Sequence, residues 1–202
     1  MKPTTLFFLR HGEVHNPQDI VYARLPRFRL SERGRQEAET TAKFLRRERL
    51  SAIYASPMLR ARQTARIVRA HHPAAPLHIS KHLLEIKTSY QGAPRSEMIK
   101  IDWDFYNHRK PGDESLADIL ARLQTQLQVT LKRHPGEKVM WVAHGDPVII
   151  FTLWGQGRPL SEVRNFKGSS YIGHASVTKF VFESGRALPL SVEYFDPNKS
   201  GK

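Results

Sequence analysis

The sequence predicts an α/β fold: a three-layer sandwich in which a mostly parallel central sheet carries helices on both faces and includes one antiparallel strand. Short apolar segments of strand length alternate along the chain with longer segments whose apolar residues recur at helical spacing. Such alternation favours parallel strands joined by crossover helices. Near the C-terminus two strand-like segments, 175–183 and 190–195, follow each other without a long helix between them, which favours an antiparallel connection.

Local signals define the individual elements. Ser31 is a suitable N-cap for the first helix, and Pro57 is placed in the first turn of the second, where a proline is tolerated. The third helix carries leucines three and four residues apart, and Asp113 or Ser115 can cap it. The predicted elements, in chain order, are strand 4–9, helix 30–48, strand 51–56, helix 57–72, strand 77–79, helix 116–131, a strand within 137–143, helix 147–155, and strands 175–183 and 190–195.

Length and composition favour one domain over residues 1–202, with 195–202 as a flexible tail. A chain of 202 residues with 40% hydrophobic residues can bury a substantial core. There is no cysteine, so neither a disulfide framework nor a cysteine zinc site is expected, and a cytoplasmic location fits. The first apolar run, 6–9, is too short for a signal-peptide core or a membrane span. We therefore expect no membrane association.

The chain is strongly basic. Lysine and arginine number 32 and aspartate and glutamate 19, a formal net charge of +13. Such a field attracts anions, among them nucleic acids and phosphorylated metabolites. The excess of positive charge is equally consistent with a surface that is simply soluble and basic, so the charge alone does not identify a partner.

Polar residues follow two of the predicted strands at the point where each strand ends. Arg10, His11 and Gly12 follow the first strand, and His144 and Gly145 follow the strand within 137–143. In open α/β sheets, ligands bind beyond the carboxyl ends of the strands. The fold can therefore bring two distant histidines together in one site.

Four sequence blocks carry a family resemblance. "LRHGE", "ASPMLRARQTA", "LLEI" and "VAHGD" occur in this order between Leu9 and Asp146. Together they resemble the histidine phosphatase superfamily, which includes the cofactor-dependent phosphoglycerate mutases. The resemblance implies a phosphoglycerate mutase-like fold and an enzyme that transfers phosphoryl groups.

The resemblance also implies roles for individual residues. His11 would be the nucleophile that forms a phosphohistidine, and Arg10 and Arg60 would bind the phosphate oxygens. His144 would be the second histidine of the pocket, also in contact with phosphate. Glu85 would protonate the leaving alkoxide and then activate the water that releases phosphate from His11.

These residue types suit the chemistry. Histidine has an ordinary pKa of about 6.5, so a useful fraction is neutral and nucleophilic near neutral pH. Arginine offers paired donors on a charge it never loses, which meets the charge of a phosphoryl group without a metal. A carboxyl group donates a proton near neutral pH only if its pKa is raised, which a pocket beside a phosphate dianion would do.

The sequence departs from the family pattern after the first block. Asn16 lies one position earlier than the asparagine that often contacts phosphate, and it joins Gly145 as a predicted phosphate-binding residue. Ala23 and Arg27 occupy positions where related sequences often have glycine. Specificity is expected to reside in segments 16–29 and 87–113, where local propensity is least informative.

The sequence predicts a metal-independent phosphomonoesterase without a cofactor, acting on a phosphorylated small molecule. Mutases of this family carry a long basic insertion between the acid and the second histidine, whereas the connection from Glu85 to His144 is short. A cofactor-dependent phosphoglycerate mutase remains the alternative. A nucleic-acid or acidic-partner binding module on an inactive scaffold is the alternative of another class, although no nucleic-acid-binding motif is present. The sequence does not predict the oligomeric state, and a homodimer is among the possibilities. The histidines of segment 71–82 do not predict a metal site.

Overall fold

A six-stranded sheet forms the centre of the structure, which is a computed structural model that describes residues 2–199. The strand order is β3-β2-β4-β1-β5-β6, and β1 pairs in parallel with β4, β4 with β2, and β2 with β3. Strand β5 pairs antiparallel with β1 on one side and with β6 on the other. Only β5 therefore runs against the others among the described strands, which confirms the predicted mostly parallel sheet with one antiparallel strand. The strands are β1 (Thr4–Arg10), β2 (Leu50–Ala55), β3 (Leu77–Ile79), β4 (Lys138–Ala143), β5 (Val177–Phe182) and β6 (Ser191–Phe195).

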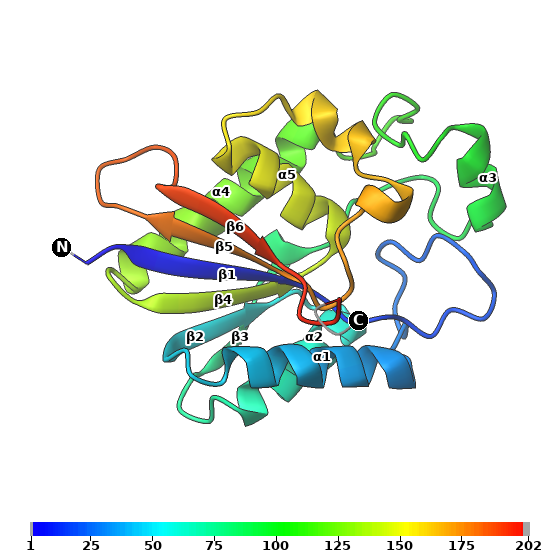
Figure 1. Ribbon diagram of the computed structural model, residues 1–202. Helices are drawn as coiled ribbons and strands as arrows, with labels where there is room; N and C mark the ends of the chain where they lie inside the picture. The colour runs from blue at the N-terminus through cyan, green and yellow to red at the C-terminus, as the bar shows by residue number, and fades with distance from the viewer. Residues whose placement is uncertain (1, 200–202) are drawn as a thin grey trace.

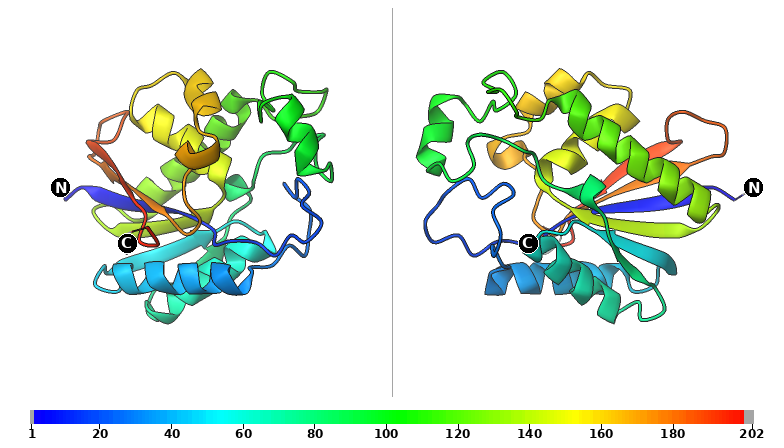
Figure 2. Two further views of the ribbon diagram at one scale, coloured as in Figure 1. Left: turned by 45° about the vertical axis from the view of Figure 1, so that its right-hand side comes forward. Right: turned by 180° about the vertical axis from the view of Figure 1, so that it is seen from behind.

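Helices cover both faces of this sheet, as Figures 1 and 2 show. Helices α1 and α2 pack together on one face, and α4 and α5 pack together on the other. The short helix α3 stands apart from both pairs, beyond one end of the sheet (Figure 1). The helices are α1 (Glu32–Leu45), α2 (Leu59–Ala70), α3 (Arg95–Lys100), α4 (Leu116–Arg133) and α5 (Gly145–Gly155), with 3-10 helices η1 (Lys81–Leu83), η2 (Leu160–Asn165) and η3 (Gly168–Ser170).

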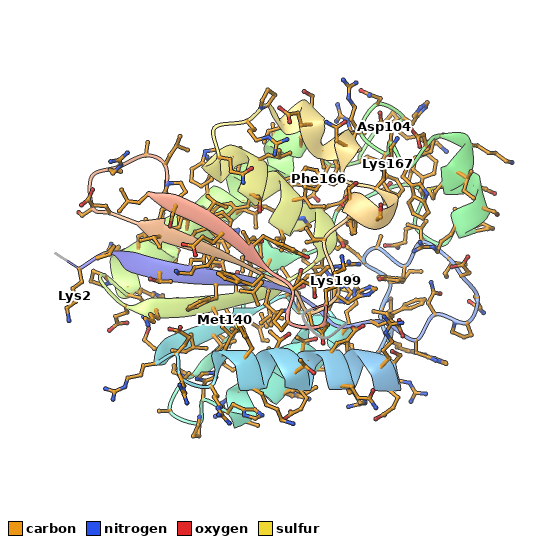
Figure 3. The ribbon with its side chains drawn as sticks, viewed as in Figure 1. Lys2, Asp104, Met140, Phe166, Lys167 and Lys199 are labelled. Carbon is orange, nitrogen blue, oxygen red and sulfur yellow. The ribbon has the colours of Figure 1, made fainter. Side chains whose placement is uncertain are left out.

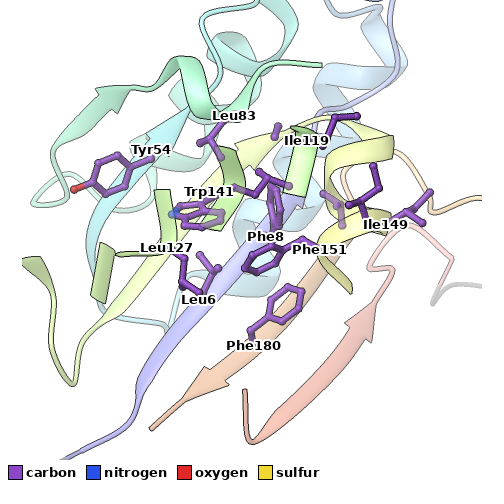
Figure 4. Close-up of a cluster of buried hydrophobic side chains, with 14 of the residues drawn as sticks. Leu6, Phe8, Tyr54, Leu83, Ile119, Leu127, Trp141, Ile149, Phe151 and Phe180 are labelled. Atoms are coloured by element: carbon purple, nitrogen blue, oxygen red, sulfur yellow. The ribbon is translucent and has the colours of Figure 1, made fainter. Parts of the chain in front are cut away.

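The alternation of side chains along β1 divides the core into two parts. Successive strand residues point to opposite faces, so Leu6 and Phe8 pack under α4 and α5 while Phe7 and Leu9 pack under α1 and α2. The α4–α5 side is rich in aromatic rings (Figure 4): Phe8 lies with its ring centroid 5.3 Å from that of Trp141 and 5.8 Å from that of Phe151, both edge-on. Both faces of β1 are therefore buried, as its continuous apolar sequence indicates.

Helix boundaries correct the sequence-based prediction in detail. Pro57 does not lie in the first turn of α2, because Met58 is the N-cap and the helix begins at Leu59. Ser115, not Asp113, caps α4 and forms a capping box with Asp118. Helix α3 was not predicted, since it lies in the irregular basic segment after Glu85.

The C-terminal segment is packed where the structure describes it. Phe195 belongs to β6, and the Asn198 side chain amide donates to the backbone carbonyl of Glu37 at 3.5 Å. The rest of the predicted flexible tail, 200–202, lies outside the described residues.

Three residues of the loop before α1, Asp19, Ala23 and Arg27, adopt backbone conformations that favour glycine. Ala23 has φ of +29° and Arg27 has φ of +69°. A side chain in the left-handed region costs about 1–2 kcal/mol, and glycine avoids this cost. Ala23 and Arg27 are the two positions where the family resemblance leads us to expect glycine, so the sequence departure coincides with local strain.

Arg27→Gly is expected to stabilise the protein against urea by up to about 1 kcal/mol. The exposed Arg27 side chain loses little on removal, and the relief of strain exceeds the entropy that glycine adds to the unfolded chain. Arg29→Gly in the same loop, where φ is not positive, is the matched control and should destabilise. Equal destabilisation by both substitutions would contradict this explanation.

Candidate active site

The two histidines of the predicted site follow neighbouring strands. Arg10 at the end of β1 is in register with Ala143 at the end of β4, so His11 and His144 begin their loops side by side. Their ring centroids lie 5.2 Å apart with an interplanar angle of 69°. The carboxyl edge of the parallel sheet thus assembles the site, as the sequence predicted.

His11 is buried and presents one ring nitrogen to the site. Its Nδ1 lies 2.7 Å from the carbonyl oxygen of Gly12, to which the Nδ1–H donates, and its Nε2 lies 3.2 Å from Nε of Arg60. Burial and the charges of Arg60 and Arg10 lower the pKa of His11 well below its ordinary value. The ring is therefore neutral near neutral pH, and its Nε2 lone pair, which accepts the Nε–H of Arg60, is the one available for nucleophilic attack.

The chain around His11 requires two glycines because two backbone segments touch. A Cβ on Gly12 would lie 2.2 Å from the carbonyl oxygen of Gly34 in α1, and a Cβ on Gly34 would lie 2.0 Å from the carbonyl oxygen of Glu13. The amide of Gly12 also donates to Oγ1 of Thr64 in α2, at 3.2 Å. These contacts fix the backbone that carries the nucleophile.

Two arginines bring positive charge to His11. Arg60 in α2 is fully buried, and its Nη2 donates to the carbonyl of Ala23 at 2.6 Å while its guanidinium lies 4.7 Å from the ring of Tyr22. Arg10 donates from Nη1 to the carbonyl of Ile172, and its guanidinium lies 4.9 Å from the ring of Tyr171. Nη1 of Arg60 and Nε of Arg10 are buried without a protein partner. Each arginine therefore keeps a donor for an anion in the site.

His144 adds a second neutral imidazole at the N-terminus of α5. Its Nε2 lies 2.8 Å from Oγ of Ser56, and its Nδ1, without a hydrogen-bond partner in the structure, lies 3.9 Å from Oε2 of Glu85. Burial and the charge of Arg60 lower the pKa of His144 well below its ordinary value. Because the helix N-terminus also attracts negative charge, this corner favours a phosphate oxygen.

Glu85 supplies a carboxyl group beside the histidines. Its backbone carbonyl accepts from Nε of Arg24 at 2.7 Å and from Nη2 of Arg122 at 3.4 Å, which holds the segment after η1 against the site. Burial and the nearby Asp146 carboxylate raise the pKa of Glu85 to about 7. A carboxyl group with this pKa can hold a proton and release it near neutral pH.

The structure brings five predicted residues together and leaves one aside. Arg10, His11, Glu85 and Gly145 line one pocket, and the fully buried Arg60 and His144 lie directly against His11 and Glu85. A Cβ on Gly145 would come within 2.0 Å of the Tyr171 hydroxyl. The site prediction for Asn16 differs from the structure, because the Asn16 amide closes its own turn. It donates to the carbonyl of Ile20 at 2.9 Å and accepts from the amide of Ile20 at 3.3 Å.

Sequence reasoning missed His174, Tyr22 and Tyr171. His174 lies before β5, and its Nε2 is 3.0 Å from Nη2 of Arg10. Burial and the charge of Arg10 lower the pKa of His174 to about 3, so the ring is neutral and can orient Arg10 by accepting its N–H. The antiparallel direction of β5 was the available signal, since the segment before an antiparallel strand lies at the same edge as the ends of the parallel ones.

The site opens into a pocket of about 500 Å³. Its outer walls come from the segment around α3 and from the segment between α5 and β5. Figure 3 shows Asp104 near Phe166 and Lys167 there. Lys167 pairs with Asp102 across this mouth, and Arg95 lies 4.6 Å over the ring of Trp103. The pocket therefore has a charged inner end and a mixed aromatic and charged mouth.

One group of side chains could offer ligand atoms to a metal ion. Among the described residues, Glu13, Glu37 and His174 place one ligand atom each within 4.8 Å of one another. Arg33 already pairs with Glu37 at 3.1 Å and with Glu13 at 3.7 Å. The arginine thus supplies the positive charge these carboxylates need.

No helix in the described part of the chain combines the length and apolar character needed to cross a bilayer.

Comparisons with known proteins agree with this geometry. The sequence model of the histidine phosphatase superfamily, branch 1, matches residues 6–193, so the chain belongs to this superfamily. The uncharacterized protein Rv0525 of Mycobacterium tuberculosis is 32% identical over 196 residues, covering 93% of this chain and 94% of Rv0525.

Solved structures extend the comparison. YhfR of Bacillus stearothermophilus superposes with a TM-score of 0.79 at 28% identity, covering 90% of this chain and 93% of YhfR. The mycobacterial glucosyl-3-phosphoglycerate phosphatase Rv2419c shares the fold, with a TM-score of 0.76 at 22% identity and coverage of 89% and 91%. The superfamily assignment supports a phosphoryl-transfer enzyme.

Proposed function

We propose that the protein is a metal-independent phosphomonoesterase that works through a phosphohistidine on His11. The observation that carries this proposal is the placement of His11 Nε2. The Nδ1–Gly12 hydrogen bond fixes the tautomer, so Nε2 carries the lone pair, and it lies in one cluster with Arg60, whose Nε–H it accepts, and with His144 and Glu85.

Phosphoryl transfer to His11 requires charge stabilisation and a proton. The unpartnered donors of Arg10 and Arg60, and the α5 N-terminus beside His144, would bind the phosphoryl oxygens. The bond between His11 Nε2 and phosphorus forms as the bond from phosphorus to the ester oxygen breaks. The proton of the Glu85 carboxyl passes to that oxygen, so the product leaves as an alcohol.

Hydrolysis of the phosphohistidine reverses the role of Glu85. The Glu85 carboxylate takes a proton from water as the water oxygen bonds to phosphorus. The bond from phosphorus to Nε2 breaks, which returns a neutral His11 and inorganic phosphate. The substrate we propose is a phosphorylated small molecule, because the pocket of about 500 Å³ leaves room beyond the phosphate for an organic group.

A phosphatase is favoured over a mutase by the walls of this pocket. Two cations of the outer mouth are already engaged, Arg95 with Asp19 at 3.2 Å and Lys167 with Asp102, and Arg164 is the third cation that lines it. A mutase must retain a doubly phosphorylated intermediate, which demands unpaired positive charge at the second phosphate.

Incubation of the enzyme with 3-phosphoglycerate or p-nitrophenyl phosphate in excess EDTA tests this proposal. We expect inorganic phosphate to be released from at least one of the two, with no 2-phosphoglycerate formed and no loss of rate on chelation. Interconversion of the phosphoglycerates without phosphate release would show a mutase. Inactivation by EDTA would contradict the metal-independent mechanism.

A further inference from the structure

The mechanism above leaves one carboxylate at the wall of the site without a role. Asp146 lies in the first turn of α5, two residues after His144. Its Oδ1 accepts a hydrogen bond from the Tyr171 hydroxyl at 2.7 Å, and its Oδ2 accepts one from the Tyr106 hydroxyl at 2.8 Å. Hydrogen bonds from two hydroxyl groups stabilise the ionised form of a carboxyl group.

The two tyrosines remain donors throughout the working pH range. Burial and the negative charge of Asp146 raise the pKa of both Tyr106 and Tyr171 well above the ordinary tyrosine value. Tyr106 comes from the segment between α3 and α4, and Tyr171 from the segment between α5 and β5. Asp146 thus has a fixed position between two pocket walls, and Gly145 leaves the space that the Tyr171 ring needs.

Glu85 lines the same pocket as this charged group. Charged or titratable groups face Glu85 from several elements: Arg60 from α2, Arg122 from α4, His144 and Asp146 at the start of α5, and Tyr106 and Tyr171 from the two segments beside Asp146. The two arginines favour the ionised carboxylate, whereas Asp146 disfavours it because like charges repel. Burial acts in the same direction as Asp146 and the two together prevail.

We propose that Asp146, held by the hydroxyl groups of Tyr106 and Tyr171, is a positioning residue that keeps the Glu85 carboxyl protonated until the leaving group departs. The two carboxyl groups have separate roles because their surroundings differ. Both carboxyl oxygens of Asp146 accept a hydrogen bond from a tyrosine hydroxyl. Glu85 faces the Asp146 carboxylate and keeps its proton. This inference rests on the proposed phosphohistidine mechanism.

The cleavage of only one class of phosphate ester should depend on Asp146. An alkyl phosphate releases a strongly basic alkoxide, which needs the proton of Glu85 as the bond to phosphorus breaks. A nitrophenyl phosphate releases a weakly basic phenolate that leaves without a proton. Loss of the Asp146 charge should therefore impair the cleavage of alkyl esters and spare that of nitrophenyl esters.

The test compares wild type with Asp146→Asn on 2-phenylethyl phosphate and p-nitrophenyl phosphate, with kcat/KM measured from about pH 5 to about pH 9. Asparagine can still hydrogen-bond to both tyrosines but carries no charge. For the alkyl ester we expect the basic limb to move down by about one pH unit, so that kcat/KM above the limb falls about tenfold. For the nitrophenyl ester we expect kcat/KM to change less than about twofold.

Two further variants complement this test, one that alters the surroundings of Asp146 and one that serves as a control. Tyr106→Phe removes one donor from Asp146 without removing its charge, and it should move the alkyl-ester limb by a smaller amount than Asp146→Asn does. Glu193→Gln removes an exposed carboxylate on β6 and should leave both profiles unchanged.

The outcomes separate this inference from the proposed function. An unchanged limb in Asp146→Asn and Tyr106→Phe, or an equal loss on both esters, would overturn the role of Asp146 while leaving a His11-dependent phosphatase intact. Absence of phosphatase activity in the wild type, or full activity in His11→Ala, would instead remove the proposed function on which the inference rests.

Discussion

We expect His11→Ala to lower kcat for any phosphate ester by at least about 10⁴-fold, the scale seen when a covalent nucleophile is removed. The reason is geometric, because no other nucleophilic side chain replaces Nε2. The nearest imidazole, that of His144, has its Nε2 2.8 Å from Oγ of Ser56, and its free Nδ1 lies on the side of Glu85. Residual activity would come only from direct attack by water.

Purified His11→Ala should keep the wild-type far-ultraviolet circular dichroism spectrum and thermal midpoint within a few degrees, which separates loss of chemistry from loss of fold. His78→Ala, which removes an exposed histidine on β3, is the matched control and should keep full activity. Activity of His11→Ala within tenfold of wild type would exclude His11 as the nucleophile.

The second large effect is expected at Arg60. Arg60→Lys should lower kcat/KM by about 10²–10³-fold, the usual cost of removing an aligned donor from developing negative charge. Lysine keeps the positive charge but has no planar fork. It cannot bond at once to Nε2 of His11, to the carbonyl of Ala23 and to a phosphoryl oxygen, the three tasks for which Arg60 has donors.

Steady-state kinetics on p-nitrophenyl phosphate measure this loss, and inorganic phosphate as a competitive inhibitor should bind more weakly to the variant. Arg66→Lys on the exposed face of the same helix is the matched control and should change neither constant. Comparable inhibition by phosphate in Arg60→Lys and wild type would contradict direct contact between Arg60 and the phosphoryl group.

Local patterns were sufficient for most of the fold. Buried strands such as β1 are continuous apolar runs, and α4 carries a leucine stripe with a Ser115 capping box, so both are visible in the sequence. Helix α3 was not, because its six residues include only two apolar ones and tertiary contacts decide its conformation. The sequence predicts Pro57 inside the second helix, whereas the backbone bends at Pro57 and Met58 and the helix begins at Leu59.

The candidate site residues likewise include some that the sequence indicates and some that only the tertiary structure reveals. Arg10, His11 and His144 follow predicted parallel strands, whose carboxyl ends lie at one edge of a sheet, so the sequence indicated that they could meet. His174 and Asp146 act through their neighbours, Arg10 and Glu85, and the sequence does not show which side chains a tertiary fold will bring together. For Asn16 the residue type alone is ambiguous, because an asparagine in a loop is as well suited to closing a turn as to binding an anion, and here it closes a turn.

The phosphorylated enzyme itself provides the most direct test of the central claim. The wild-type enzyme would be mixed with p-nitrophenyl phosphate, quenched in alkali within milliseconds, where phosphohistidine is stable, and analysed by peptide mass spectrometry. We predict one phosphoryl group on the peptide that contains His11, with none in His11→Ala. A phosphoryl group on another residue, or turnover by wild type with no phosphorylated peptide at any quench time, would contradict the mechanism.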